Sequence, residues 1–430
     1  MILIHGGRVV DPGHLVGMAD VLIKEGRIIA VEPDLTRRAD LRRAEQIDAS
    51  GCLVLPGFVD LHVHLREPGF EYKETIATGT AAAVAGGFTA VCCMPNTKPV
   101  NDSTVVTKLI RDRAQETSCA TVYPVGAITK GSRGRELSDF KALKEADCVA
   151  LSDDGRPVMD DQVMRAAMNM ATEVDLPVID HCEDLGLSSC GCMNDGPVSR
   201  ALGFRGMPAM AEDRMVKRDI MLAQETGARL HIAHVSTAGT VQAVRQAKQK
   251  GLPVTAEVCP HHFSLTEEVV WEQRANAKMN PPLRSERDQS ALIEGLADGT
   301  IDAIATDHAP HAEYEKQWGM DRAPFGIVGL ETALGLTLRL VQDGHLSLER
   351  AVACLTHQPA NIVSVSRGTL RPGADADVTL VDPHAKWIVD PETFHSKGRN
   401  TPFAGWTLTG RVVCTMVAGR TVYRYSVGEA

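Results

Sequence analysis

Residues 57 to 344 alternate short apolar runs with longer amphipathic segments. The apolar runs are typical of strands buried on both faces, and the segments between them repeat apolar residues at helical spacing. The predicted strands are 57–64, 88–95, 121–128, 148–154, 176–183, 228–236, 253–260 and 301–308. The predicted helices are 76–87, 104–116, 137–146, 162–174, 213–227, 240–250, 287–299 and 329–344. Eight strand–helix units in succession predict an α/β fold, the TIM (β/α)8 barrel.

The two ends of the chain follow a different pattern. Residues 1–55 and 368–430 contain short strand-like runs separated by Gly and Asp-Pro turns. Neither piece is long enough to bury a comfortable core alone. We therefore expect both pieces to pair into one small β-sandwich domain, with the catalytic barrel spanning residues 56–367.

Composition and charge narrow the classes of partner. The 430 residues are 44% hydrophobic, enough for a large core, and their formal net charge is −10. Such a chain offers no basic surface for nucleic acid or an anionic membrane, so a small-molecule substrate is the expected partner. No apolar run approaches the roughly 20 residues that span a bilayer, and the N-terminus lacks a signal-peptide pattern. These features predict a soluble, cytoplasmic protein.

The eleven cysteines are an odd number scattered along the chain, which is typical of free thiols in a reducing compartment. Cys190 and Cys192 form a CxC motif that could bind a metal ion or oxidise. No second cysteine pair at zinc-finger spacing accompanies it. We therefore interpret both as ordinary thiols.

Polar residues gather where the predicted strands end, which is where TIM barrels build their active sites. His62 and His64 are two residues apart, so in a strand both imidazoles project from one face. An isolated pair of this kind is more often two half-buried histidines, but other strand ends add further metal-ligand types. The residues at these ends are His62, His64, Asp153, Asp154, His181, His234, Asp307 and His308.

Four histidines and two carboxylates facing one point predict a metal centre. Six ligands exceed the needs of one tetrahedral zinc and suit two metal ions bridged by a carboxylate, each with an open position for water. The reaction class is therefore hydrolysis, or its reverse, at a carbonyl group.

The motifs that carry these residues resemble the dihydroorotase family, within the amidohydrolase superfamily, over nearly the whole chain. They are PGFVDLHVHLREPG at 56–69, MPNT at 94–97, SDDG at 152–155, DHCED at 180–184, IAHVST at 232–237, CPHH at 259–262, MNPPLR at 279–284 and ATDHAPH at 305–311. The resemblance implies conversion between L-dihydroorotate and N-carbamoyl-L-aspartate in pyrimidine synthesis. It also implies two Zn²⁺ ions per subunit, a homodimer, and possible association with aspartate carbamoyltransferase.

The resemblance also implies roles for the metal-binding residues. His62 and His64 would bind the first metal, and His181 and His234 the second. Asp154 would bridge them, where many relatives use a carboxylated lysine. Lys130 could be proposed for that role, but its Gly-flanked loop favours a solvated lysine. Successive strand residues face opposite sides, so Asp153 and Asp154 cannot both enter the site, and the family pattern selects Asp154.

Asp307 matches the family's catalytic aspartate and is expected beside the metals as well. It would take a proton from the attacking water and give it to the leaving nitrogen. The metals would polarise the carbonyl and stabilise the oxyanion.

Substrate recognition requires a cation for the substrate carboxylate. Arg66 lies two residues beyond His64, so it faces the same cavity if the strand continues, although a surface salt bridge would fit the spacing too. By resemblance Arg66, Asn96 and His311 hold the carboxylate, Asn280 and the Phe325–Gly326 backbone contact the ring, and His64 also lies against the substrate. Residues 311–326 could form a lid that excludes water or an ordinary surface loop.

The remaining histidines have structural interpretations. His231 should face away from His234 into packing, His261 and His262 should support the seventh strand by hydrogen bonds, and His308 should support its neighbour rather than bind metal.

Two alternatives to dihydroorotase activity remain. An allantoinase, hydantoinase or dihydropyrimidinase would keep the metals and change the substrate. A non-catalytic homologue would serve as a structural partner of aspartate carbamoyltransferase, although such copies typically lose ligands.

Overall fold

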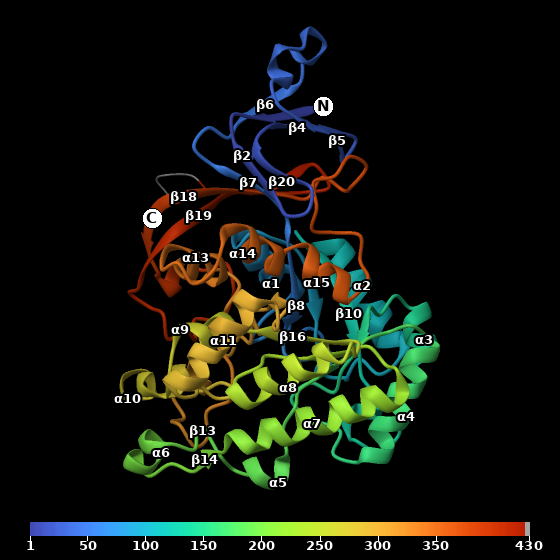
Figure 1. The fold of residues 1–430 in the computed structure, drawn as a ribbon, viewed down its shortest axis with the longest axis vertical. Coiled ribbons are helices and arrows are strands. Elements are labelled where there is room, and N and C mark those ends of the chain that lie inside the picture. The colour runs from blue at the N-terminus through green and yellow to red at the C-terminus, as the bar shows by residue number, and fades with distance from the viewer. Residues whose placement is uncertain (426–430) are drawn as a thin grey trace.

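The predicted barrel is confirmed. The computed structural model describes residues 1–425, and in this range eight parallel strands form a nearly closed sheet in chain order. Figure 1 shows the barrel below the sheets that the two chain ends form. A parallel bridge between Val63 and His308 brings the last unit beside the first. The barrel strands are β8 (Phe58–Val63), β9 (Phe88–Cys93), β10 (Thr121–Gly126), β11 (Ala150–Leu151), β12 (Val178–Asp180), β15 (Leu230–Ile232), β16 (Val254–Val258) and β17 (Ala303–Ile304).

A helix follows each strand, and side-chain N-caps explain where several of these helices begin. Ser285 caps one helix by accepting a hydrogen bond from the Asp288 amide, and Asp160 accepts from two amides at the start of another. The principal helices are α1 (Ile76–Ala85), α2 (Thr104–Thr117), α3 (Phe140–Glu145), α4 (Asp161–Glu173), α7 (Ala209–Thr226), α8 (Ala238–Gln249), α11 (Glu286–Asp298) and α13 (Ala333–Gln342). None of the helices in the described range is long and apolar enough to cross a membrane.

Helix α3 begins three residues later than predicted. Leu137 forms an antiparallel bridge with Thr129, so the chain is still extended there. Asp139 then caps the helix by accepting from the Ala142 amide at 3.0 Å.

Short elements extend the loops on the site side of the barrel and close its opposite end. They are α5 (Leu185–Ser188), β13 (Met193–Asn194), α6 (Pro197–Leu202), β14 (Gly206–Met207), α9 (Pro260–Ser264), α10 (Val270–Gln273), α12 (Glu313–Lys316), α14 (Leu348–Leu355) and α15 (His357–Ile362). Cys190 and Cys192 lie in the β12–α7 excursion, and all eleven cysteines are free thiols.

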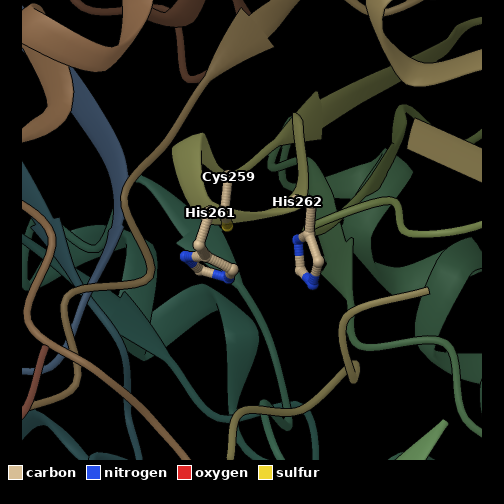
Figure 2. A group of neighbouring side chains, drawn as sticks. All are labelled: Cys259, His261 and His262. Carbon is tan, nitrogen blue, oxygen red and sulfur yellow. The ribbon is translucent and has the colours of Figure 1, made fainter. Parts of the chain in front are cut away.

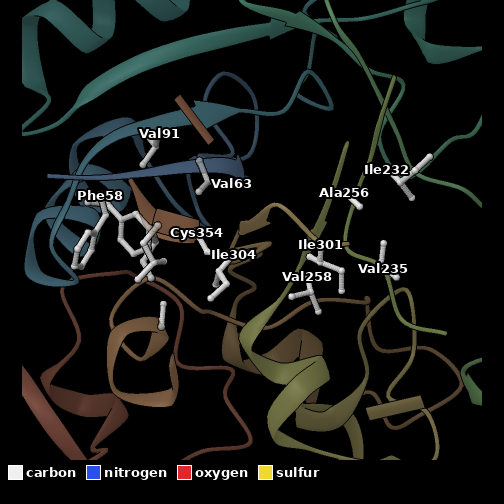
Figure 3. Close-up of a cluster of buried hydrophobic side chains, with 14 of the residues drawn as sticks. Phe58, Val63, Val91, Ile232, Val235, Ala256, Val258, Ile301, Ile304 and Cys354 are labelled. Carbon is white, nitrogen blue, oxygen red and sulfur yellow. The ribbon is translucent and has the colours of Figure 1, made fainter. Parts of the chain in front are cut away.

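The barrel core has two parts. Phe58, Val91, Val258 and Ile304 belong to a large buried cluster that includes the packing between strands and surrounding helices (Figure 3). A second cluster collects Leu61, Cys92, Val125, Ile179 and Ala303. Residues from so many strands can meet only inside the barrel, which is therefore a packed core rather than a channel.

The two chain ends form the predicted β-sandwich. One sheet has the order β5 (Arg27–Glu32), β4 (Asp20–Lys24), β1 (Ile2–His5), β6 (Glu45–Asp48). The other has the order β20 (Arg420–Arg424), β19 (Thr407–Val417), β18 (Val378–Ile388), β7 (Leu53–Pro56), β2 (Arg8–Asp11), β3 (Leu15–Met18). Strand β7 pairs with both β2 and β18, so it joins the two ends in one sheet. A buried cluster with Ile4, Val21, Val54 and Met416 lies between the sheets.

Candidate metal centre

Six predicted ligands meet at the C-terminal rim of the barrel. They come from five strand ends and are all buried, none more than 6% exposed: His62, His64, Asp154, His181, His234 and Asp307. The rim is therefore a place where the fold concentrates ionisable groups out of water.

Asp154 lies at the centre of this group. Its Oδ1 is 3.2 Å from His62 Nε2, 3.8 Å from His181 Nδ1 and 3.7 Å from His234 Nε2. Its Oδ2 is 3.6 Å from His64 Nε2. One carboxylate within 4 Å of four imidazoles occupies the position that a bridging ligand requires.

The remaining contacts divide the imidazoles into two pairs. Asp307 Oδ1 is 2.9 Å from His64 Nε2 and 3.7 Å from His62 Nε2. On the other side of Asp154, His181 Nδ1 and His234 Nε2 are 2.9 Å apart. Each pair presents nitrogen atoms to a common point, as two neighbouring metal sites would need.

The outer nitrogens of three imidazoles are hydrogen-bonded to oxygen acceptors, so the inner nitrogens point toward the other ligands. His62 Nδ1 donates to Glu257 Oε1 at 3.0 Å, and His64 Nδ1 donates to Asn96 Oδ1 at 2.9 Å. His181 Nε2 donates to Glu183 Oε2 at 2.9 Å. Such outer partners fix the tautomer of metal-binding histidines and turn the inner lone pair toward the ion.

A divalent metal ion fits this donor set. Within residues 1–425, the buried His62 Nε2 has no hydrogen-bond partner, although it points between two carboxylates. Two donor groups overlap at this atom: His62, His64 and Asp307 form one, and His62, Asp154 and His234 form the other. Neutral imidazole and carboxylate are the ligands that zinc-type ions bind.

The surroundings keep both carboxylates ionised. Burial alone would raise the pKa of Asp154, but the surrounding imidazoles, His62 and His234 above all, hold it well below its usual value. Burial also opposes ionisation of Asp307, yet the His64 hydrogen bond and the His62 charge lower its pKa. Both groups are therefore available as ligands or proton acceptors.

A cavity of about 210 Å³ opens beside the six ligands. Its walls contain ten of the predicted residues together with Gly155 and Ala309. The predicted residues that line it are His64, Arg66, Asn96, Asp154, His181, His234, Asn280, Asp307, Phe325 and Gly326.

Arg66 reaches the cavity by a route that differs from the prediction. Strand β8 ends at Val63, so the expected alternation does not extend to this residue. Instead Arg66 has φ +63°, in the left-handed region, and its Nε donates to the Pro310 carbonyl at 3.2 Å. His234 and Asp307 also have positive φ, at 32° and 46°. Such conformations cost of order 1–3 kcal/mol for non-glycine residues and concentrate at functional sites.

His311 lies behind Arg66 rather than on the cavity wall. Its Nε2 is 3.3 Å from Arg66 Nη2 and donates to the Phe325 carbonyl at 2.7 Å. Lys73 Nζ donates to Nδ1 at 3.1 Å, and since an ammonium group cannot accept, the hydrogen must be on Nε2. Burial and the Arg66 charge lower the pKa of His311, so it is neutral.

Comparisons with known proteins agree with this geometry. A Dihydro-orotase-like family model matches residues 51–240, and an Amidohydrolase family model matches residues 209–423. A dihydroorotase of Syntrophotalea carbinolica is 55% identical over 426 residues, covering 99% of each chain. One of Syntrophus aciditrophicus is 51% identical over 430 residues, covering 98% of this chain and 99% of its own.

The chain belongs to the dihydroorotase family. Among solved structures, an L-hydantoinase (dihydropyrimidinase) from Arthrobacter aurescens has a TM-score of 0.89 at 26% identity, covering 98% of this chain and 96% of its own. A dihydropyrimidinase from Brevibacillus agri has a TM-score of 0.85 at 25% identity, covering 98% and 95%. The same architecture therefore serves several cyclic amide hydrolases, and the cavity must distinguish this dihydroorotase-family chain from them.

Other residues considered for the dihydroorotase site lie outside the cavity. Lys130 is exposed and pairs with Glu136. Asp153 turns away from the ligands and accepts from the Thr129 amide at 3.1 Å. His231 bonds Thr255 and Glu257, and His308 lies 3.4 Å from Glu74.

Cys259, His261 and His262 form a second buried group of potential ligands at the end of β16 (Figure 2). His262 Nε2 donates to the Pro281 carbonyl at 2.9 Å, a supporting contact. Burial lowers the pKa of His261 to about 4. We assign this group to packing beneath the rim.

Glu257 and Glu183 are partners that the sequence reasoning missed. Each carboxylate holds the outer nitrogen of a predicted ligand, and both are buried or nearly so. Two signals were present: Glu257 is a lone acidic residue in an apolar strand, and Glu183 follows His181 by two positions.

Proposed function

We propose that this chain is a dihydroorotase, which interconverts L-dihydroorotate and N-carbamoyl-L-aspartate in pyrimidine synthesis. The observation that carries the proposal is the guanidinium of Arg66. It lines the cavity beside the metal-ligand cluster, and within the described residues it forms no ion pair. A cation held there without an acidic partner suits a substrate carboxylate, which dihydroorotate has and the unsubstituted hydantoin ring lacks.

We further propose two Zn²⁺ ions, one held by His62 and His64, the other by His181 and His234. Asp154 would bridge them. When bound, such ions would polarise the substrate carbonyl and lower the pKa of water. The distances from Asp154 to all four imidazoles support this assignment.

The cavity walls orient the ring between the carboxylate-binding end and the ligands. Arg66 and Asn96 hold the carboxylate, with His311 packed behind the guanidinium. Asn280 and the Phe325–Gly326 backbone face the ring. Holding the amide carbonyl at a fixed place converts water attack into a nearly intramolecular step.

Asp307 is the proton-transfer group of this proposal. In ring opening, water oxygen adds to the amide carbonyl carbon while Asp307 accepts one of its protons. The carbon–nitrogen bond then breaks, Asp307 returns that proton to the leaving nitrogen, and the new carboxylic acid ionises to solvent. Ring closure follows the same path in reverse.

The deciding experiment measures turnover of the metal-loaded protein on dihydroorotate, hydantoin, dihydrouracil and allantoin. We expect dihydroorotate to be preferred by at least about tenfold in kcat/KM, because a buried charged contact contributes about 1.5–3 kcal/mol. Arg66→Gln should raise KM for dihydroorotate about tenfold or more, whereas Arg135→Gln, at an exposed arginine, should not. Turnover of only the carboxylate-free substrates would reject the proposal.

The same preparation tests the metal assignment. Metal analysis should give about two zinc ions per chain, and removal by a chelator should abolish turnover until zinc is restored.

A cytoplasmic location accords with the eleven free thiols. Homodimer formation, association with aspartate carbamoyltransferase and the division at residues 55/56 and 367/368 stay predictions.

A further inference from the structure

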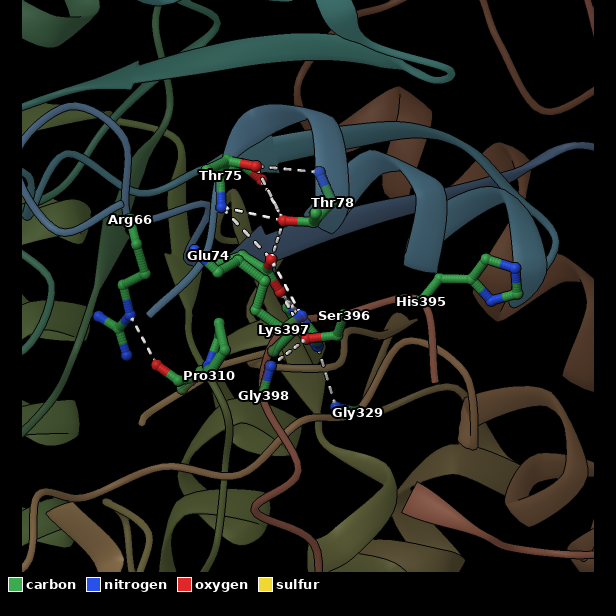
Figure 4. Close-up of polar contacts among 12 residues, drawn as sticks. Arg66, Glu74, Thr75, Thr78, Pro310, Gly329, His395, Ser396, Lys397 and Gly398 are labelled. Atoms are coloured by element: carbon green, nitrogen blue, oxygen red, sulfur yellow. Dashed lines mark hydrogen bonds and ion pairs between the residues drawn. The ribbon is translucent and has the colours of Figure 1, made fainter. Parts of the chain in front are cut away.

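The polar segment 396–400 lies between β18 and β19 in sequence and packs against the barrel rim. Ser396 donates to the buried Glu74 carboxylate, and the Lys397 amide donates to the same group at 3.3 Å (Figure 4). The Gly398 amide donates to Ser396 Oγ at 3.0 Å. A Cβ at Gly398 would lie 2.7 Å from the Pro310 side chain, so the segment can approach the rim only with glycine there.

Asn400 forms hydrogen bonds through both polar atoms of its carboxamide with backbone groups at the two ends of the loop 311–326. Its Oδ1 accepts from the His311 amide at 3.1 Å. Its Nδ2 donates to the Ala309 carbonyl at 3.1 Å and to the Gly326 carbonyl at 3.0 Å. Asn400 is only 4% exposed, so no water competes strongly for these bonds.

Two of the three residues that Asn400 holds belong to the cavity wall, although His311 and Asn400 itself do not. Ala309 and Gly326 both line the cavity. Gly326 has φ +121°, and a Cβ there would lie 2.5 Å from the Ala309 Cβ. The backbone segments around Ala309 and Gly326 are therefore in close contact. A shift of either segment changes the shape of the substrate-facing surface.

We infer that Asn400 is a positioning residue, which clamps both ends of the loop 311–326 so that its Gly326 and His311 ends fit the substrate. The inference rests on the proposed function for its kinetic part. Only a carboxamide combines one acceptor with two donors in this space. An aspartate would turn an acceptor toward two carbonyl oxygens, and an alanine would leave three buried backbone groups without partners.

The test compares Asn400→Asp and Asn400→Ala with two controls in the full-length, metal-loaded protein. Asn169→Asp makes the same substitution at an exposed position of α4. Thr415→Val removes a buried hydrogen bond from the C-terminal region to the Val84 carbonyl, remote from the rim. The readouts are KM and kcat for dihydroorotate, metal content, melting temperature and hydrogen exchange of residues 309–328.

Both Asn400 variants should raise KM at least about tenfold while kcat falls less than about threefold, because two or three buried hydrogen bonds are lost from the binding wall and none from Asp307. Exchange of residues 309–328 should become faster, with metal content unchanged. Thr415→Val should lower the melting temperature alone, and Asn169→Asp should change neither KM nor exchange.

An unchanged KM, a loss confined to kcat, or unchanged exchange of residues 309–328 would overturn the inference. If Asn400→Ala does not fold, Asn400→Ser, which keeps one hydrogen-bonding group, is judged by the same criteria. If the wild-type protein does not turn over dihydroorotate, the proposed function fails. The hydrogen-exchange comparison then still decides whether Asn400 clamps the loop.

Discussion

The rim of the barrel and the terminal β-sandwich bury residues of opposite character. The rim buries His62 within 4 Å of both Asp154 and Asp307. The cluster between the sandwich sheets instead contains Ile4, Val21 and similar apolar side chains. Burying charged groups returns less stability than burying well-packed apolar ones of similar volume. The rim is therefore organised for binding and chemistry, and the sandwich contributes packing.

Backbone conformation shows the same contrast. At the rim, residues with left-handed conformations carry the proposed function: Arg66, His234 and Asp307. In the sandwich, left-handed non-glycine residues such as Glu25 and Ala418 precede glycines at hairpin turns, where this conformation is ordinary. At the rim, the left-handed backbone conformation sets the direction of functional side chains. In the sandwich, it only allows the chain to reverse at a turn.

The largest expected effect comes from Asp307→Asn. The amide has nearly the same shape but cannot accept the proton from water, so kcat should fall at least about 1000-fold. The melting temperature should change little, because the amide oxygen of Asn can still accept the hydrogen bond from His64 Nε2. Steady-state kinetics and calorimetry on one preparation measure both. Near wild-type turnover would refute the assigned proton acceptor.

A second pair of variants tests whether the rim discriminates between neighbouring carboxylates. Asp154→Asn should lower bound metal and reduce kcat/KM more than about 100-fold, because even the outer partners of metal ligands are worth 10–100-fold. Asp153→Asn should keep its metal, since Asp153 bonds the Thr129 amide away from the cavity. Metal analysis and kinetics measure the difference. Equal losses in both variants would contradict the assignment of Asp154 alone.

The barrel and its metal ligands could be predicted largely from the periodicity of apolar residues. Eight apolar runs followed by helical patterns predicted where the strands end. The ligands could then be predicted at these ends, because the C-terminal ends of parallel barrel strands lie at one rim. Helix α3 began late because the chain first paired Leu137 with Thr129. Pairing of that kind depends on a partner distant in space and leaves no local pattern.

The supporting residues were harder to predict. Arg66 was expected in the cavity on the assumption that the strand continues. It lies there instead with a positive φ. No pattern of side chains in the sequence predicts a left-handed conformation at an arginine. The sequence around Asn400 shows no apolar periodicity and contains no metal-ligand motif. Its importance depends on three backbone groups that come together only in the fold.

The smallest expected effect on turnover comes from the sandwich, although its effect on stability is large. Ile4 is fully buried between the two sheets, and Ile4→Ala should lower the free energy of unfolding by about 2–5 kcal/mol through lost burial and a residual cavity. Because this cluster contains none of the rim ligands among the described residues, kcat and KM should stay within about twofold of wild type. Urea denaturation and kinetics below the transition measure the two quantities separately. A KM change larger than this would mean that sandwich packing sets the geometry of the rim, and the two regions would then be one energetic unit.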